Sequence, residues 1–154
     1  MSSVLPAIRD RLTTALAGAT VVLDRALDPG DPDEVLIVRD GPAGSPRDLD
    51  HRSRAALERH AVQVLARART PSAAVTLAWR AYYALPARRL TTSGGVIDWL
   101  VANHTPYHVG YDQNDRALVS INFTLQRWGN LEPDRTVTAA LASATVGGLQ
   151  PSVT

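Results

Sequence analysis

Two periods run through the apolar and polar positions of this chain, and together they predict both helices and strands. Apolar residues recur at helical spacing over residues 4–16, and Gly18 follows them, so a first helix is expected there. A second helix is expected over residues 71–85, because Thr70 offers an N-cap side chain and Pro71 suits the first helical position.

The second expected helix carries a broad apolar arc with aromatic residues at its edge. The arc covers roughly 200° of the helical wheel, wider than the ~100° stripe that covering a sheet requires. Trp79 and Tyr83 lie at its edge. Either the helix is sunk deep in the core, or this aromatic edge meets a neighbouring subunit, as aromatic residues often do at interfaces.

Strands are expected where β-branched or alternating apolar residues are bounded by turn residues. The segments are residues 20–23, 34–39, 60–69, 96–103 and 116–127. Alternation assigns their faces. The last strand has an apolar row of Val119, Ile121, Phe123 and Leu125. The strand over 96–103 places Ile97, Trp99 and Val101 on one face. The strand over 60–69 places Arg67 and Arg69 on the face opposite its apolar residues Val62, Val64, Ala66 and Ala68.

The remaining segments predict loops and a tail. Residues 40–54 are rich in Gly, Pro, Asp and Arg, which is typical of an exposed loop, and residues 104–115 connect the last two strands. Residues 1–128 are expected to form a single domain, and residues 129–154 a C-terminal arm or flexible tail. The order of elements predicts an α+β fold, with an antiparallel or mixed β-sheet of about four to five strands and two helices packed on one face.

Composition narrows the possible functions. The net charge is only +1 and all sixteen basic residues are arginine, so we expect no sequence-specific DNA binding. The chain has no cysteine, which excludes disulfides, thiolate metal sites and cysteine nucleophiles. No apolar run approaches the ~20 residues that span a bilayer, so no membrane partner is expected.

Motifs for catalysis are sparse. The chain has no Gly-rich phosphate loop and no GxSxG elbow, and we expect no cofactor. The best candidate for a metal site is the pair His104 and His108, but Pro106 between them opposes the helical geometry that an i, i+4 pair needs. A small metal-dependent enzyme that uses these histidines with Asp112 is therefore kept only as a rival hypothesis.

The segment 106–116 looks built to hold a shape. Gly110 permits a backbone conformation closed to other residues, and Asp112 suits a turn. Arg116 at the start of the last strand is expected to form a charge-assisted hydrogen bond with a nearby carboxylate such as Asp112.

The stretch from Gly95 to Leu125 resembles the C-terminal half of the minor capsid and tail-terminator proteins of long-tailed bacteriophages. The residues that carry the resemblance are Pro106, Gly110, Asp112, Arg116, Asn122 and Phe123. The upstream segment with Gln63, Val64 and Arg67, followed by Ala81 and Tyr82, also resembles the family. The resemblance spans residues 1–128 and is strongest over 59–127.

The resemblance implies a structural virion protein rather than an enzyme. Copies would form a ring, expected to be a hexamer, which caps the tail tube and joins it to the head. The expected partners are other copies of the chain, the tail tube protein, a head-completion or connector protein, and passing phage DNA read without sequence specificity. The protein would act at the head–tail junction of the virion, after assembly in the host cytoplasm. The alternative is another head-to-tail connector protein.

Two sets of residues are candidates for these contacts. The candidate subunit-interface residues are Trp79, Tyr83, Tyr107, His108, Asp112 and Arg116. The candidate lumen-facing residues are Arg67 and Arg69.

Overall fold

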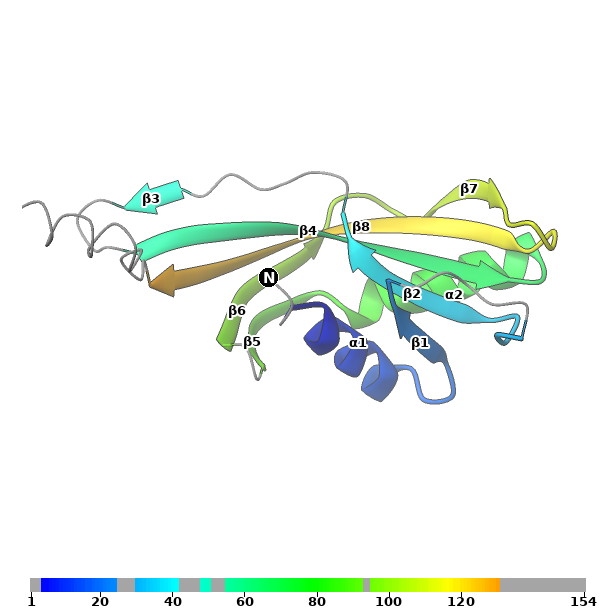
Figure 1. Ribbon diagram of the computed structural model, residues 1–154, viewed down its shortest axis with the longest axis horizontal. Helices are drawn as coiled ribbons and strands as arrows, with labels where there is room; N and C mark the ends of the chain where they lie inside the picture. Colours follow the sequence, from blue (N-terminus) through cyan, green and yellow to red (C-terminus); the bar gives the residue numbers. More distant parts are fainter. Residues whose placement is uncertain (1–3, 25–29, 42–47, 51–54, 93–94, 131–154) are drawn as a thin grey trace, which may run out of the picture.

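The computed structural model describes residues 4–24, 30–41, 48–50, 55–92 and 95–130 (Figure 1). Its two helices are α1 (Val4–Ala15) and α2 (Pro71–Ala84). The strands are β1 (Thr20–Leu23), β2 (Val35–Asp40), β3 (Asp48–Asp50), β4 (Ala55–Ala68), β5 (Ala87–Thr92), β6 (Gly95–Ala102), β7 (Tyr107–Tyr111) and β8 (Ala117–Asn130). The α+β class is confirmed, but the expected four to five strands were too few.

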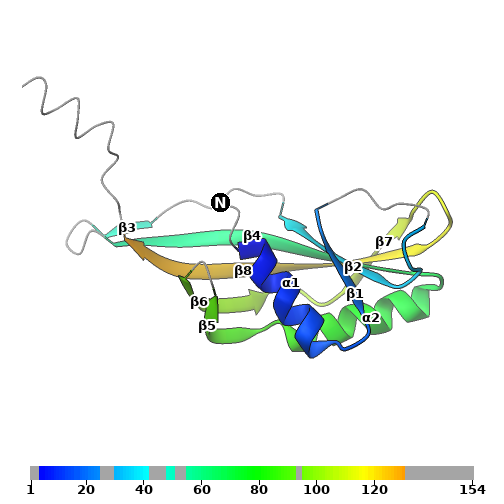
Figure 2. The same cartoon turned by 60° about the horizontal axis from the view of Figure 1, so that its bottom comes forward.

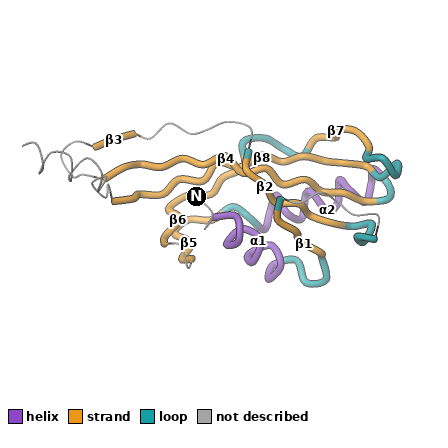
Figure 3. Tube along the Cα trace, in the orientation of Figure 1, coloured by secondary structure: helices purple, strands orange, loops and turns teal. Residues whose placement is uncertain are grey.

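Two long strands form the centre of the sheet. β4 and β8 have 14 residues each and pair antiparallel from Ala55↔Asn130 to Ala68↔Ala117. Two shorter strands pair with different parts of the outer edge of each long strand. β2 and β3 pair with β4, and β6 and β7 pair with β8. The main path is β1-β2-β4-β8-β6-β5, and Figure 3 shows it as one curled sheet.

The first two strands pair in parallel, which makes the sheet mixed. The register runs from Thr20↔Val35 to Leu23↔Val38. A mixed sheet is one of the two arrangements that the sequence predicted, and this parallel pair is the reason that the sheet is not wholly antiparallel.

Both helices cover the same face of the sheet, as predicted (Figure 2). The apolar row Val119, Ile121, Phe123 and Leu125 is fully buried beneath them, beside Val62 and Val64 of β4. The Thr70 hydroxyl caps α2 by accepting a hydrogen bond from the Ala73 N–H at 3.2 Å, and Gly18 has a φ of 88° just beyond α1. The local signals that predicted both helices are therefore confirmed.

Three strands were missed because their sequences carry weak strand signals. β3 has three residues and lies within the expected loop over residues 40–54. β5 begins Ala-Arg-Arg and contains Arg89 at a φ of 50°. β7 contains Gly110 at a φ of 144°, and its register with β8 shifts between His108 and Gly110. These strands form by pairing with a neighbour rather than from their own periodicity.

The alternation predicted for β6 holds for Trp99, Leu100 and Val101, but Ile97 departs from it. Ile97 is buried, whereas Trp99 and Val101 are exposed, and Leu100 lies in the core. Leu100 pairs with Leu125 of the inward row, so Trp99 and Val101 must face the other side of the sheet. Ile97 instead lies where β6 pairs with β5, and the sheet curls around the core at that point.

Candidate functional site

The outer edge of α2 carries a cluster of three aromatic rings. Trp79 stacks on Tyr83 with ring centroids 5.6 Å apart, and Tyr82 packs edge-on against both rings. The opposite side of the helix, with Ala74, Leu77, Ala78 and Ala81, is buried against the sheet. Tyr83 is 75% exposed and Trp79 is half-buried, so the aromatic edge remains open to solvent and is not sunk in the core.

A second aromatic group lies at the far end of the sheet, and sequence reasoning did not select it. Trp99 of β6 is 44% exposed and Trp128 of β8 is 58% exposed. The Arg88 guanidinium lies 4.4 Å from the Trp99 ring centroid, in a cation–π contact. The Asp98 carboxylate accepts a hydrogen bond from the Trp128 N–H at 3.0 Å, which ties β6 to the end of β8.

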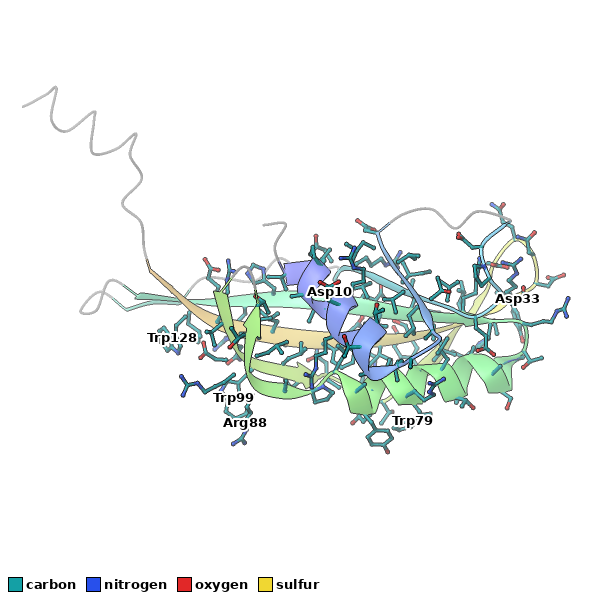
Figure 4. The ribbon with its side chains drawn as sticks, turned by 90° about the horizontal axis from the view of Figure 1, so that it is seen from below. Asp10, Asp33, Trp79, Arg88, Trp99 and Trp128 are labelled. Atoms are coloured by element: carbon teal, nitrogen blue, oxygen red, sulfur yellow. The ribbon has the colours of Figure 1, made fainter. Side chains whose placement is uncertain are left out.

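These two groups lie along one side of the molecule. Figure 4 shows Trp79, Arg88, Trp99 and Trp128 projecting on the same side, from α2, β5, β6 and β8. We refer to Trp79, Tyr83, Arg88, Trp99 and Trp128 as the aromatic side. Large exposed aromatic side chains gathered on one side are a signature of an interaction surface.

The third exposed group belongs to β7. Tyr107, Val109 and Tyr111 are exposed, and the His108 ring packs against the Tyr111 ring with centroids 5.0 Å apart. Within the described residues β7 pairs only with β8, so its outer edge carries no neighbouring strand. Tyr107 and His108 therefore lie at an accessible sheet edge.

The turn from β7 to β8 is held by Asp112. Its Oδ1 atom accepts hydrogen bonds from the backbone N–H groups of Asn114 at 2.8 Å and Arg116 at 2.9 Å. The Asp112 N–H also donates to the Arg116 carbonyl at 2.9 Å, and Asp115 adopts a φ of 57°. The carboxylate thus closes the turn, as its position in the sequence predicted.

Arg116 pairs with a carboxylate, as predicted, but the partner is Asp33 and not the suggested Asp112. Its guanidinium lies 3.1 Å from Asp33 Oδ1, two residues before β2. The carboxylate of Asp112 instead lies 3.5 Å from Arg67. The turn is consequently tied to a segment about 80 residues earlier, a contact that local spacing does not reveal.

Arg67 is buried at the centre of this charged group. Its side chain is only 1% exposed, and Nη2 donates to the Pro32 carbonyl at 2.7 Å. A side chain so covered cannot face a lumen, which corrects that expectation. Its neighbour Arg69 is 83% exposed and lies 3.8 Å from Asp33, so Arg69 alone remains a candidate for a lumen contact.

The surroundings of Asp112 shift the pKa of its carboxyl group. Its partial burial is the largest single effect and acts to raise the pKa, but the backbone hydrogen bonds from Arg116 and Asn114 and the nearby positive charges together outweigh it. The positive charges of Arg67 and Arg116 act in the same direction as these bonds. The pKa of Asp112 is lowered from its ordinary value of 3.8, so the carboxylate is ionised at neutral pH.

His104 and His108 do not lie on one face of a helix, because His104 is in a bend and His108 is in strand β7. His104 Nε2 accepts a hydrogen bond from the Asn122 N–H at 3.2 Å, and its Nδ1 lies 2.8 Å from the Thr105 carbonyl. His108 lies in a strand and packs against Tyr111. The described part of the chain contains no group of three or more side chains suited to a metal ion.

Comparison with known proteins identifies the family. The model of the bacteriophage tail terminator protein family matches residues 25–127, about two thirds of the chain. A solved structure titled as the virion of a native gene transfer agent particle has a chain of similar fold, with a TM-score of 0.57 and 20% sequence identity. That match covers 82% of this chain and 96% of the other.

No curated protein matches the sequence. Among the described residues, neither helix is long and apolar enough to cross a membrane. The family match agrees with the resemblance carried by Pro106, Gly110 and Asp112. It also contradicts the rival hypothesis of a metal-dependent enzyme, because the family is structural. The chain belongs to the bacteriophage tail terminator proteins, a family of structural components of the virion tail.

Proposed function

We propose that copies of this protein close into a hexameric ring on the head-proximal end of the tail tube. Family membership implies contact with the tail tube. A ring of identical subunits uses heterologous contacts, in which one surface of each copy meets a different surface of the next copy. The observation that carries this proposal is the aromatic side, because Tyr83, Trp99 and Trp128 are exposed together in the isolated subunit.

The aromatic side supplies the contact between neighbouring copies. Tryptophan, tyrosine and arginine are the residue types that dominate binding energy in protein interfaces. Trp79 and Tyr83 are pre-organised by their 5.6 Å stacking, and Trp99 by Arg88, so little side-chain entropy is lost when a neighbour covers them. Each ring buried in this way removes a large apolar area from water.

Tyr107 and His108 extend the contact at the open edge of β7. Asp112 and Arg116 contribute indirectly, because both are engaged within the subunit and hold the turn next to this edge. Their role is to keep β7 in place rather than to reach a partner.

Arg69 faces the lumen of the proposed ring. It is highly exposed, and its 3.8 Å contact with Asp33 at the surface is weak enough to rearrange. An exposed arginine attracts phosphates without reading bases, which suits DNA that must pass through without stopping. The small net charge of the chain fits a conduit better than a DNA-binding protein.

The ring acts by occupying the surface on which the next tube subunit would stack. Growth of the tube then stops, and the opposite surface of the ring is presented to a head-completion or connector protein. This function requires binding energy and shape, and no covalent step.

Deletion of the gene tests the role in the particle that encodes it. We expect tails of uncontrolled, often excessive length and full heads without tails in electron micrographs. Normal-length tails joined to heads would overturn the terminator role. Normal-length tails without heads would instead assign the protein to the neighbouring connector position.

Native mass spectrometry of the purified chain, alone and with its tail tube, tests the ring. A sixfold mass in the presence of the tube is expected. A purely monomeric or dimeric species bound to the tube would overturn the ring.

A further inference from the structure

A groove between α1 and β5 is not used by any contact described above. It has a volume of about 490 Å³ and is lined by side chains of α1, β5 and the end of α2. Most of these side chains are small, including Ala7, Thr14 and Ala15 of α1 and Ala84 of α2. Figures 1 and 2 both show α1 lying beside β5 at this position. The groove is therefore open to solvent and lined mostly by short side chains.

One wall of the groove is a sheet edge. β5 is the last strand of the sheet, and within the described residues it pairs only with β6. Leu90 and Thr91 of β5 line the groove. An extended peptide can add to such an edge by backbone hydrogen bonds, with its side chains placed against the neighbouring helix.

The groove is formed before any partner arrives. Arg11 of α1 reaches across to the end of α2, where its Nε atom donates to the Ala84 carbonyl at 3.1 Å and to the Leu85 carbonyl at 3.2 Å. Its Nη2 atom lies 3.3 Å from the Pro86 carbonyl. A positive charge at the C-terminal end of a helix is favourable, because it interacts with the exposed carbonyl groups there. The Arg11 guanidinium thereby holds α1 at a fixed distance from the start of β5.

The chain carries a segment suited to this groove in residues 131–154, which lie outside the described part. Residues 136–146 read Thr-Val-Thr-Ala-Ala-Leu-Ala-Ser-Ala-Thr-Val, without charge, proline or glycine. Ten of these eleven side chains are Ala, Ser, Thr or Val, which matches the small residues that line the groove. The threonine and valine residues also favour extended backbone.

The direction of β8 determines which groove the segment reaches. β8 ends at Asn130 pointing away from both helices (Figure 1), and therefore away from its own α1–β5 groove. The five residues between Asn130 and Thr136 can span only about 20 Å when extended, so the groove that receives the segment must belong to a directly adjoining copy.

We propose that residues 136–146 of one copy lie extended in the α1–β5 groove of a neighbouring copy and pair with the open edge of β5. The inference rests on the proposed ring, because it requires a neighbour. In the ring, each copy would give one segment and receive another, so that every subunit boundary is closed by a strand as well as by aromatic side chains. Because the segment is covalently continuous with β8, its binding is favoured by a high local concentration.

Disulfide trapping tests this arrangement, because the natural chain has no cysteine to interfere. One full-length protein carries Thr14→Cys in the groove, and a second carries Ala139→Cys, Ala142→Cys or Thr145→Cys in the segment. After mixing and mild oxidation, we expect a mixed disulfide-linked dimer for at least one segment position.

Thr13→Cys is the matched control. Thr13 and Thr14 are both exposed on α1, and each hydroxyl donates to the carbonyl four residues earlier at 2.9 Å, but only Thr14 lines the groove. The mixed dimer should form at least tenfold more slowly with Thr13→Cys. Equal rates for the two positions would overturn the proposal.

Two further outcomes separate this proposal from the ring itself. The assembly state of the same proteins under reducing conditions reports on the ring. Rings that yield no trapped dimer would overturn segment exchange and leave the ring standing. A double variant, Thr14→Cys with Ala142→Cys, that closes only within its own chain would assign the segment to its own groove and overturn exchange between neighbours.

Discussion

The paired strands β4 and β8 have the same backbone pairing along their whole length, but other parts of the chain cover only one of the two ends. Near Ala68 and Ala117 the helices pack on one face, and on the other face Arg67 is sealed by Pro32 and Asp112. Towards the far end the inward positions change from apolar to charged, where Glu58 and Arg127 pair at 2.6 Å. Figure 1 shows this end extending beyond both helices.

This difference separates stability from recognition along one pair of strands. The covered half buries Val62, Val64, Ile121 and Phe123, and supplies most of the apolar area removed from water on folding. The extended half exposes Trp128 and provides aromatic surface without a core beneath it. Substitutions in the covered half should therefore act on folding, and those in the extended half on assembly.

The largest expected effect comes from the middle of the covered half. Phe123→Ala should lower the free energy of unfolding by about 3–5 kcal/mol, because Phe123 is fully buried and its removal leaves a cavity. Urea denaturation of the purified subunit measures this change. A loss below about 1 kcal/mol would mean that this part of the ladder is not the core.

Two arginines two residues apart sharpen the comparison within the covered half. Arg67→Met should cost about 1.5–3 kcal/mol of unfolding free energy, because the Pro32 carbonyl and the Asp112 carboxylate lose a buried charged donor. The control Arg69→Met should change it by less than about 0.5 kcal/mol, since Arg69 is mostly exposed. Equal losses from both variants would contradict the distinct roles assigned to them.

The extended half should show the opposite behaviour. Trp128→Ala should change the unfolding free energy by less than about 1 kcal/mol, because Trp128 is largely exposed. The same variant should weaken assembly by about 2 kcal/mol or more if Trp128 is a hot spot of the ring. Sedimentation of the assembled protein measures the second effect, with the exposed Gln113→Ala as a control that should assemble normally. A Trp128→Ala protein that unfolds easily would move this end into the core.

The smallest expected effect is a pH dependence at the covered end. The pKa of Asp112 is lower in the folded chain than its ordinary value of 3.8, so the ionised carboxylate stabilises the fold above that value. This contribution should decline as the pH falls below 3.8 through the folded-state pKa. Asp112→Asn keeps an oxygen for the Asn114 and Arg116 N–H groups but has no charge. Its stability should therefore approach that of the natural chain as the pH is lowered, in thermal unfolding curves taken from pH 5 downward. A constant difference across the acidic range would contradict the lowered pKa.

The parts of the fold that were predictable from sequence are those with a local cause. The Thr70 cap, the alternation over Val119 to Leu125 and the turn residue Asp112 each act on neighbours in the chain, and all three are confirmed. β5 and β7 lack such a pattern, and they become strands only because β6 and β8 offer them hydrogen-bonding edges. Periodicity cannot detect an element that is specified by its partner.

The candidate site divides in the same way. Trp79 and Tyr83 could be selected because helical spacing places them together at one edge of α2. Trp99 and Trp128 were missed, since alternation grouped Trp99 with the buried Ile97 and the curl of β6 separates them. The available signal was one tryptophan in the first half of the strand over 96–103 and another at the end of the last strand, because antiparallel pairing brings these positions together. Arg67 could not be placed correctly, because the residues that cover it lie 35 and 45 positions away in the chain.

The long register between β4 and β8 also has a consequence for how the chain folds. The ladder begins at Ala68↔Ala117, where 48 intervening residues must already be brought into a loop, and it ends at Ala55↔Asn130. Closing such a loop costs entropy before any pair is gained, so the transition state should contain the covered end and lack the extended one. The β4–β8 residue pairs near Trp128 would form last and open first, because pairing proceeds from the covered end towards the extended end. A newly made subunit would then complete its core before the ends of β4 and β8 near Trp128 are ordered. Copies would therefore come into contact only after each one has folded.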